Sequence, residues 1–301
     1  GAIYVSGLVE AWIAIGLTIG AYLNWRFVAP RLRSYTEVSN NSITLPSFLE
    51  SRFRDNTRLL RIASGLIILV FFTFYVSSGM VAGGVFFEAS FGTHYLFGML
   101  LVAGITLTYT LFGGFLGASL TDVAQGMLMF AALIIIPVTT VFVLGGIDET
   151  IAAINAADAA HNAANPDNPL RRTSLLFGGS ILAILSAASW GLGYFGQPHI
   201  IVRFMALRSH ADAKAGRRIG IGWMVLVASG AVLTGLIGAG YFHLSDRTLD
   251  NPETVFLVLS QILFHPFIAG LVLAAVLAAI MSTISSQLLV CSSALGEDLY
   301  K

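Results

Sequence analysis

The chain alternates between long apolar stretches and short polar segments, and the apolar stretches are the first guide to its fold. A helix needs roughly 20 residues to cross the hydrocarbon core of a bilayer. Seven stretches reach that length, at residues 7–25, 60–86, 95–117, 122–145, 174–202, 219–242 and 267–294. They lack the alternation of apolar and polar positions that marks a barrel strand. The pattern therefore predicts an all-α integral membrane protein with about seven transmembrane helices.

Composition agrees with a membrane protein and excludes two functional classes. Hydrophobic side chains make up 56% of the 301 residues and charged ones 11%, against roughly 25% charged in a soluble domain, and the mean hydropathy is +0.82. Sixteen basic residues balance sixteen acidic ones and are too dispersed to bind nucleic acid. The sequence has no paired intramembrane carboxylates and no motif of a metal site or nucleophile. We therefore expect neither an enzyme nor a nucleic-acid-binding protein.

The distribution of Lys and Arg predicts the orientation of the spans. Most basic residues lie in 26–61 and 203–218, on one side of an alternating topology, and loops rich in Lys and Arg face the cytoplasm. The segment 145–173, rich in Ala, Asn, Asp and Pro, is then an irregular external loop, and 253–266 an external half-helix. An external amino end without a signal sequence implies an earlier span. We expect residues 1–301 to be one transmembrane domain and an internal fragment of a longer polypeptide.

The fifth apolar stretch carries an interruption near its middle. Three glycines and a proline between Ser189 and His199 weaken helical hydrogen bonding. Unpaired backbone at membrane depth is tolerated only where it lines a cavity or meets a ligand. Trp190 and Tyr194 are four residues apart and would share a helix face, where they can stack on an apolar or cationic solute. The sequence predicts a broken helix at a binding site, with a proline kink beside an interfacial aromatic pair as the alternative.

The seventh stretch carries hydroxyl side chains near its middle, within residues 282–286. Ser282 and Ser286 lie on one helix stripe with Ala279. Hard cations such as Na⁺ prefer neutral or anionic oxygens, and hydroxyls together with the carbonyls of a broken neighbouring helix supply them. These residues are candidates for an ion site. The alternative is hydrogen bonding between helices by small polar residues.

Acidic residues are missing from the middle of all seven stretches. Glu10 and Asp122 lie at stretch ends, and His199 is the one histidine near either motif, toward the inner side. Proton-coupled transporters use titratable relays inside the membrane, so Na⁺ fits this segment better than H⁺. Asp122, directly after Thr121, is expected to cap the amino end of the fourth span on the cytoplasmic side.

Several runs of the sequence match a known family. They are WGLGYFGQPH at 190–199, RFMA at 203–206, AIMST at 279–283, QLLVCSSA at 287–294, EDLY at 297–300, YTLFGGF at 109–115 and EAWIAIGL at 10–17. Through these runs the whole chain resembles the sodium:solute symporter family, in its branch of bacterial sodium/proline symporters. The run FGQPH at 195–199 is the most specific to that branch.

This resemblance implies a fold and a function. The fold is a leucine-transporter-type core of two inverted repeats of five helices, here incomplete, with the seven spans as core helices two to eight. The function is secondary active transport, the Na⁺-coupled uptake of L-proline by alternating access in the bacterial cytoplasmic (inner) membrane. Na⁺ is the coupling ion, and the partners are L-proline, Na⁺ and the lipid bilayer, without an obligatory protein partner. The alternatives are a Na⁺ symporter for another small solute and a membrane sensor that binds proline without moving it.

The resemblance also implies roles for individual residues. Na⁺ would be bound by the carbonyl of Ala279 and the hydroxyls of Ser282 and Thr283. L-proline would be bound by Trp190, Tyr194 and Pro198, and Tyr109 matches a tyrosine that influences transport.

Overall fold

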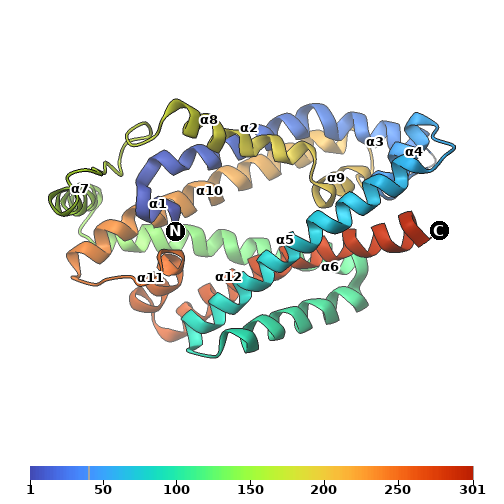
Figure 1. The fold of residues 1–301 in the computed structure, drawn as a ribbon. Helices are drawn as coiled ribbons and strands as arrows, with labels where there is room; N and C mark the ends of the chain where they lie inside the picture. Colours follow the sequence, from blue (N-terminus) through green and yellow to red (C-terminus); the bar gives the residue numbers. More distant parts are fainter. Residues whose placement is uncertain (40, 301) are drawn as a thin grey trace. The chain divides into compact units, whose positions relative to one another are not determined.

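The computed structural model describes residues 1–39 and 41–300, and all regular structure within these two ranges is helical. Besides the α-helices, η1, η3 and η4 are short 3₁₀-helices, and η2 and η5 are π-helices. Figure 1 shows these elements along the chain. The elements before residue 145 are α1 (Ala2–Ser6), η1 (Gly7–Glu10), α2 (Ala11–Leu23), η2 (Asn24–Val28), α3 (Ala29–Val38), α4 (Leu45–Phe53), α5 (Leu59–Phe91) and α6 (Tyr95–Val143). The later ones are α7 (Ile147–Ala164), α8 (Ile181–Ser189), η3 (Trp190–Phe195), α9 (Pro198–Met205), α10 (Asp212–Leu244), η4 (Pro252–Thr254), α11 (Val255–Leu263), α12 (Pro266–Ser293) and η5 (Ala294–Tyr300). The prediction of an all-helical protein is confirmed.

Within the described residues, five helical stretches are long and apolar enough to cross a membrane. They are Ala2–Val38, Leu59–Phe91, Tyr95–Val143, Asp212–Leu244 and Pro266–Tyr300. These five contain six of the seven predicted spans, because the spans expected at 95–117 and 122–145 both lie in α6. The remaining one, at 174–202, is divided among α8, η3 and α9. The chain is therefore built to pass through a membrane several times.

Helix α6 is bent at a single glycine. Gly114 has φ 54° and ψ −154°, the one non-helical conformation inside this 49-residue element. That region of backbone conformation is essentially open to glycine alone. The residues between the two predicted spans, 118–121, are part of the helix.

The segment 145–173 differs from its prediction as an irregular loop. Its first two thirds form α7, an 18-residue helix. Alanine, the strongest helix former, recurs through this helix. Asp148 and Glu149 lie in the first turn and His161 in the last, an arrangement that suits the helix dipole. The alanine content of the segment therefore outweighs the Asn, Asp and Pro residues that favour a loop. The segment 253–266 contains the nine-residue helix α11, and the external position of both segments stays a prediction.

The chain folds into two compact units. Unit 1 consists of Gly1–Gly20, Met127–Leu192 and Ile221–Val276, and unit 2 of Ala21–Gly126, Gly193–Gly220 and the residues from Leu277 onward. Each unit has its own apolar core, with Ile136, Phe242 and Leu259 buried in unit 1 and Phe204 and Met205 buried in unit 2. Most of the candidate site residues belong to unit 2.

In unit 2, helix α5 packs closely against α6 and α12, which carry several of the candidate site residues. A Cβ atom on Gly79 would lie 2.7 Å from Cγ1 of Ile284 on α12, and one on Gly83 would lie 3.0 Å from Cγ2 of Val102 on α6. Real Cβ atoms essentially never show the first distance, and the second is tighter than nine in ten real Cβ contacts. Glycine therefore allows α5 to approach both helices, as small residues do between membrane helices.

Candidate functional site

The fifth predicted span is broken, as the sequence predicted. Helix α8 ends at Ser189, η3 covers Trp190–Phe195, and α9 starts at Pro198. Gln197 has an extended backbone (φ −84°, ψ 102°), the conformation that proline imposes on the residue before it. Pro198 occupies the first turn of α9, where its missing N–H disrupts no helical bond. The break exposes backbone groups that need partners from elsewhere.

The type of helix at the break changes how its aromatic residues are arranged. Trp190 and Tyr194 were expected to share a face, which residues four apart do in an α-helix. They lie instead in the 3₁₀-helix η3, whose three residues per turn place side chains four apart about 120° from each other. Trp190 is 64% exposed, Tyr194 is half-buried and Pro198 is buried. Trp190 belongs to unit 1 and Tyr194 and Pro198 to unit 2.

Side chains from the first helical stretch contact both ends of the broken segment in unit 2. The amide Nδ2 of Asn24 donates to the carbonyl of Tyr194 at 2.7 Å, and Nη1 of Arg33 donates to the carbonyl of Met205 at 2.8 Å. Between them, the rings of Trp25 and Phe204 pack edge to face with centroids 4.6 Å apart. Sequence reasoning missed these contacts, because the residues involved are separated by about 170 positions along the chain.

The predicted ion residues lie together on α12. The hydroxyls of Ser282 and Thr283 each donate to the carbonyl oxygen of Ala279, both at 3.0 Å. A hydroxyl has one proton to donate and two lone pairs, so both oxygens keep lone pairs for a cation. Ser282 is half-buried and Thr283 is exposed. The three expected oxygen ligands are thus adjacent, in a chemistry suited to Na⁺.

The hydroxyl of Tyr109 lies close to these α12 residues. It donates to the carbonyl of Met281 at 2.9 Å, linking α6 to α12. Met281 directly precedes Ser282 in the chain. The structure therefore brings Tyr109 next to the residues expected to bind the ion, whereas the resemblance associated it with transport of the substrate.

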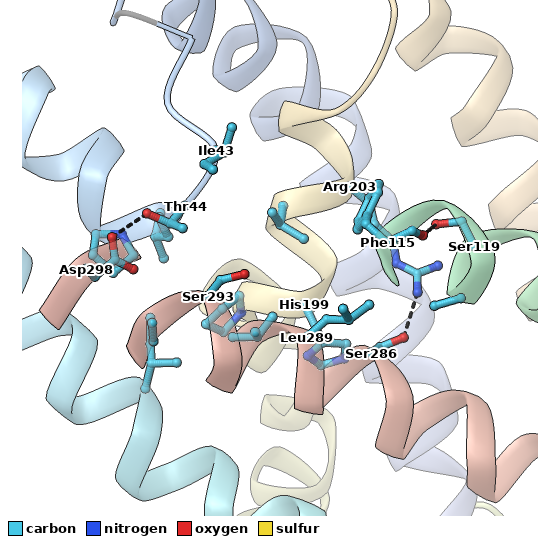
Figure 2. A pocket seen from close by; sticks show the side chains of 18 residues that line it. Ile43, Thr44, Phe115, Ser119, His199, Arg203, Ser286, Leu289, Ser293 and Asp298 are labelled. Atoms are coloured by element: carbon cyan, nitrogen blue, oxygen red, sulfur yellow. Dashed lines mark hydrogen bonds between the residues drawn. The ribbon is translucent and has the colours of Figure 1, made fainter. Parts of the chain in front are cut away.

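A pocket in unit 2 lies between the break and α12. It is lined by Ile43, Thr44, Leu45, Pro46, Ile68, Phe115, Ala118, Ser119, Pro198, His199, Val202, Arg203, Ser286, Leu289, Val290, Ser293, Ala294 and Asp298. Figure 2 shows a hydrogen bond from Arg203 to Ser286 on one side and one between Thr44 and Asp298 on the other. Pro198 is the residue of the predicted proline site that lines this pocket.

Arg203 connects three elements beside this pocket. Its Nη2 donates to Oδ2 of Asp122 on α6 at 2.6 Å and to the hydroxyl of Ser286 on α12 at 2.7 Å. The expectation that Asp122 caps the start of a span is wrong, because α6 continues through this position and has no start there. Asp122 is instead the ion-pair partner of an arginine 81 residues further along the chain. His199, four residues before Arg203 on α9, packs against the rings of Phe72 and Tyr75.

Comparison with known proteins identifies the class. The model of the sodium:solute symporter family matches residues 1–301. The chain is 58% identical over 301 residues to the high-affinity proline transporter PutP of Bacillus subtilis, covering all of this chain and 61% of that protein. It is 50% identical over 301 residues to the osmoregulated proline transporter OpuE of Bacillus subtilis (59% of that protein), and 50% identical over 303 residues to a sodium/proline symporter of Staphylococcus aureus (57% of that protein). The chain therefore spans about three fifths of the length of these curated relatives. All three are named as transporters or symporters and none as an enzyme.

Proposed function

This chain belongs to the sodium:solute symporter family, and we propose that its protein takes up L-proline together with Na⁺ by alternating access across the bacterial cytoplasmic membrane. Na⁺ occupancy organises the broken helix, proline then closes the external path, and both leave toward the cytoplasm. The finer fold belongs to the same proposal, a leucine-transporter-type core in which this chain supplies core helices two to eight.

The observation that carries the proposal is the break between α8 and α9. Irregular backbone at membrane depth is stable only where protein groups or a bound solute satisfy it, and transporters place their substrates at such discontinuous helices. The names of the most similar relatives supply the substrate, since they are proline transporters and sodium/proline symporters.

The proposed binding residues divide into two groups. The carbonyl of Ala279 and the hydroxyls of Ser282 and Thr283 bind Na⁺. Both hydroxyls donate to that carbonyl at 3.0 Å, which places the three oxygens together. Because a carbonyl has only two lone pairs, the hydroxyls release it when the ion binds. The rings at the break and Tyr109 bind or orient L-proline. The residues of this second group are Trp190, Tyr194, Pro198 and Tyr109.

Radioactive proline uptake into proteoliposomes containing the intact transporter tests the function. We expect uptake to require an inward Na⁺ gradient and to stop when choline replaces Na⁺. Uptake that persists in choline would contradict coupling to Na⁺. Binding without uptake would identify a sensor, and Na⁺-dependent uptake of another solute in preference to proline would identify a symporter of different specificity.

A further inference from the structure

Asn24 is a polar side chain with no access to solvent. It is 0% exposed and lies in the membrane-spanning stretch Ala2–Val38. Its Oδ1 is buried without a hydrogen-bond partner. An unsatisfied buried acceptor is destabilising, whereas an apolar side chain of similar size would avoid that loss. The presence of asparagine here therefore needs a reason other than packing.

Its Nδ2 supplies the reason, because it bonds the backbone at the break. Tyr194 lies one residue before the end of the 3₁₀-helix η3, and α9 starts only at Pro198. Backbone groups at such a break have to be satisfied by other parts of the protein. The Nδ2 of Asn24 donates to the carbonyl of Tyr194 at 2.7 Å. The amide has only one useful orientation, since its oxygen cannot bond a carbonyl.

The element that carries Asn24 is itself shaped for this contact. The π-helix η2 begins at Asn24, and the N–H of Ala29 bonds to its carbonyl. Single-turn π-helical bulges inside longer helices are frequently found at functional sites. Directly beyond it, Trp25 packs on Phe204 and Arg33 bonds the carbonyl of Met205. The contact at Tyr194 is thus the first of three that hold α9 and the residues leading into it.

We propose that Asn24 is a positioning residue of the substrate site, which holds the backbone at Tyr194 in place by donating to its carbonyl. This inference rests on the proposed function, since Tyr194 is one of the residues expected to bind proline. Asn24 does not touch the substrate. It determines where the ring of Tyr194 and the bend at Gly196 and Gln197 are held.

The first test measures proline uptake kinetics of the intact transporter with Asn24→Leu and Asn24→Val. Both side chains remove the donor and leave no polar group in its place. We expect the KM for proline to rise about tenfold in both variants, as for loss of a donor to a buried group. The maximal rate should stay within about twofold, because the lost interaction is one of binding.

The matched control is Thr36→Val. Thr36 is also buried in unit 2 (2% exposed), but its hydroxyl donates to Leu32 of its own helix at 2.7 Å. We expect its KM for proline to equal that of the unsubstituted protein. The inference is overturned if both Asn24 variants keep the original KM, or if Thr36→Val raises the KM as much as they do.

A second measurement separates this inference from the proposed function. Hydrogen exchange of peptides covering residues 190–200 needs neither proline nor transport. We expect faster exchange there in Asn24→Leu and unchanged exchange in Thr36→Val. If the transporter moves no proline but this difference is found, the positioning role holds and the proposed function fails. If Na⁺-dependent proline uptake is found but Asn24→Leu alters neither exchange nor KM, the positioning role alone fails.

Discussion

Polar side chains within the apolar helices of unit 2 are used in two ways. Ser282 and Thr283 bond the carbonyl of Ala279 in their own helix, so their lone pairs remain available. Asn24 and Tyr109 bond carbonyls of other elements, which fixes the backbone there. The side chains that bond within their own helix can be found from the sequence, because their hydroxyls are clustered in one short run. The side chains that bond another element cannot, because the neighbouring residues contain no information about which distant carbonyl is the partner.

The ion site is tested with Ser282→Ala and Thr283→Ala. Each substitution removes one oxygen that is proposed to bind Na⁺, so we expect the Na⁺ concentration for half-maximal proline uptake to rise about tenfold, as for the loss of one polar contact. Thr73→Ala is the control, since the Thr73 hydroxyl makes the same kind of bond to Leu69 of its own helix, on α5. An unchanged Na⁺ requirement in both α12 variants would remove these residues from the ion site.

The substrate site is tested with Trp190→Ala. We expect the KM for proline to rise roughly three- to thirtyfold, the range for loss of an aromatic contact with a cationic or apolar solute. Trp223→Ala is the control, because Trp223 is another exposed tryptophan of unit 1 that lies on α10, outside the predicted site. Equal KM values for the two variants would exclude a direct role for Trp190.

At the scale of elements, the path of the chain depends on where its helices break or bend. The break before Pro198 could be predicted, since glycine and proline in a long apolar stretch have a direct effect on helical bonding. The bend at Gly114 could not, because Gly83 and Gly84 form a similar adjacent pair in an apolar stretch and stay within the helix α5, so a pair of glycines does not by itself specify a bend. Helix α7 was missed because the composition of its segment suits both a loop and a helix.

The bend is tested with Gly114→Ala. Alanine has to adopt φ 54°, which costs about 1–3 kcal/mol for a residue other than glycine. We expect a lower yield of folded protein and a lower thermal midpoint in detergent. Gly117→Ala is the matched control, because a Cβ atom at either position meets nothing within 4 Å, but Gly117 lies in ordinary helix. Equal midpoints for the two variants would mean that the bend does not depend on glycine.

An ion-pair network joins α4, α5 and η5. Arg61 contacts Glu50 at 2.9 Å, Asp298 at 3.3 Å and the carbonyl of Glu297 at 2.7 Å, and the side chain of Asp298 is 0% exposed. Removing one partner of a buried pair costs about 3–5 kcal/mol. We expect Arg61→Ala to lower the thermal midpoint clearly.

The control for this network is Arg208→Ala. Arg208 and Asp212 are 3.9 Å apart and largely exposed, and such pairs contribute about 0–1 kcal/mol. We expect the midpoint of this variant to stay close to that of the unsubstituted protein. A similar loss in both variants would show that the burial of Asp298 adds nothing to stability.

At the scale of the whole molecule, the sequence predicted the class of protein better than its assembly. Uninterrupted apolar stretches establish membrane helices, because no other backbone arrangement of that length is stable in lipid. The division into two compact units could not be predicted, since it depends on which of several apolar faces pack together. Family membership followed from motifs that match over the whole chain.

The proposed coupling has an electrical consequence that can be measured on the intact transporter. Proline is neutral overall, so each cycle with one Na⁺ moves one positive charge. One charge crossing 100 mV is worth about 2.3 kcal/mol, or roughly a 50-fold concentration ratio. With the Na⁺ gradient held constant, clamping the potential of proteoliposomes from −100 mV to zero should lower the equilibrium accumulation of proline by that factor. Accumulation that is independent of the potential would exclude net charge movement.

The bend in α6 also bears on biosynthesis. Its two arms, Tyr95 to Gly113 and Phe115 to Val143, are about 28 and 43 Å long, and each reaches the length of a membrane crossing. The two arms are joined by only one residue of non-helical backbone. This connection is too short for one arm to stay in water while the other is already in the lipid. We therefore expect the translocation machinery to release the two arms into the bilayer as a helical hairpin, in a single step.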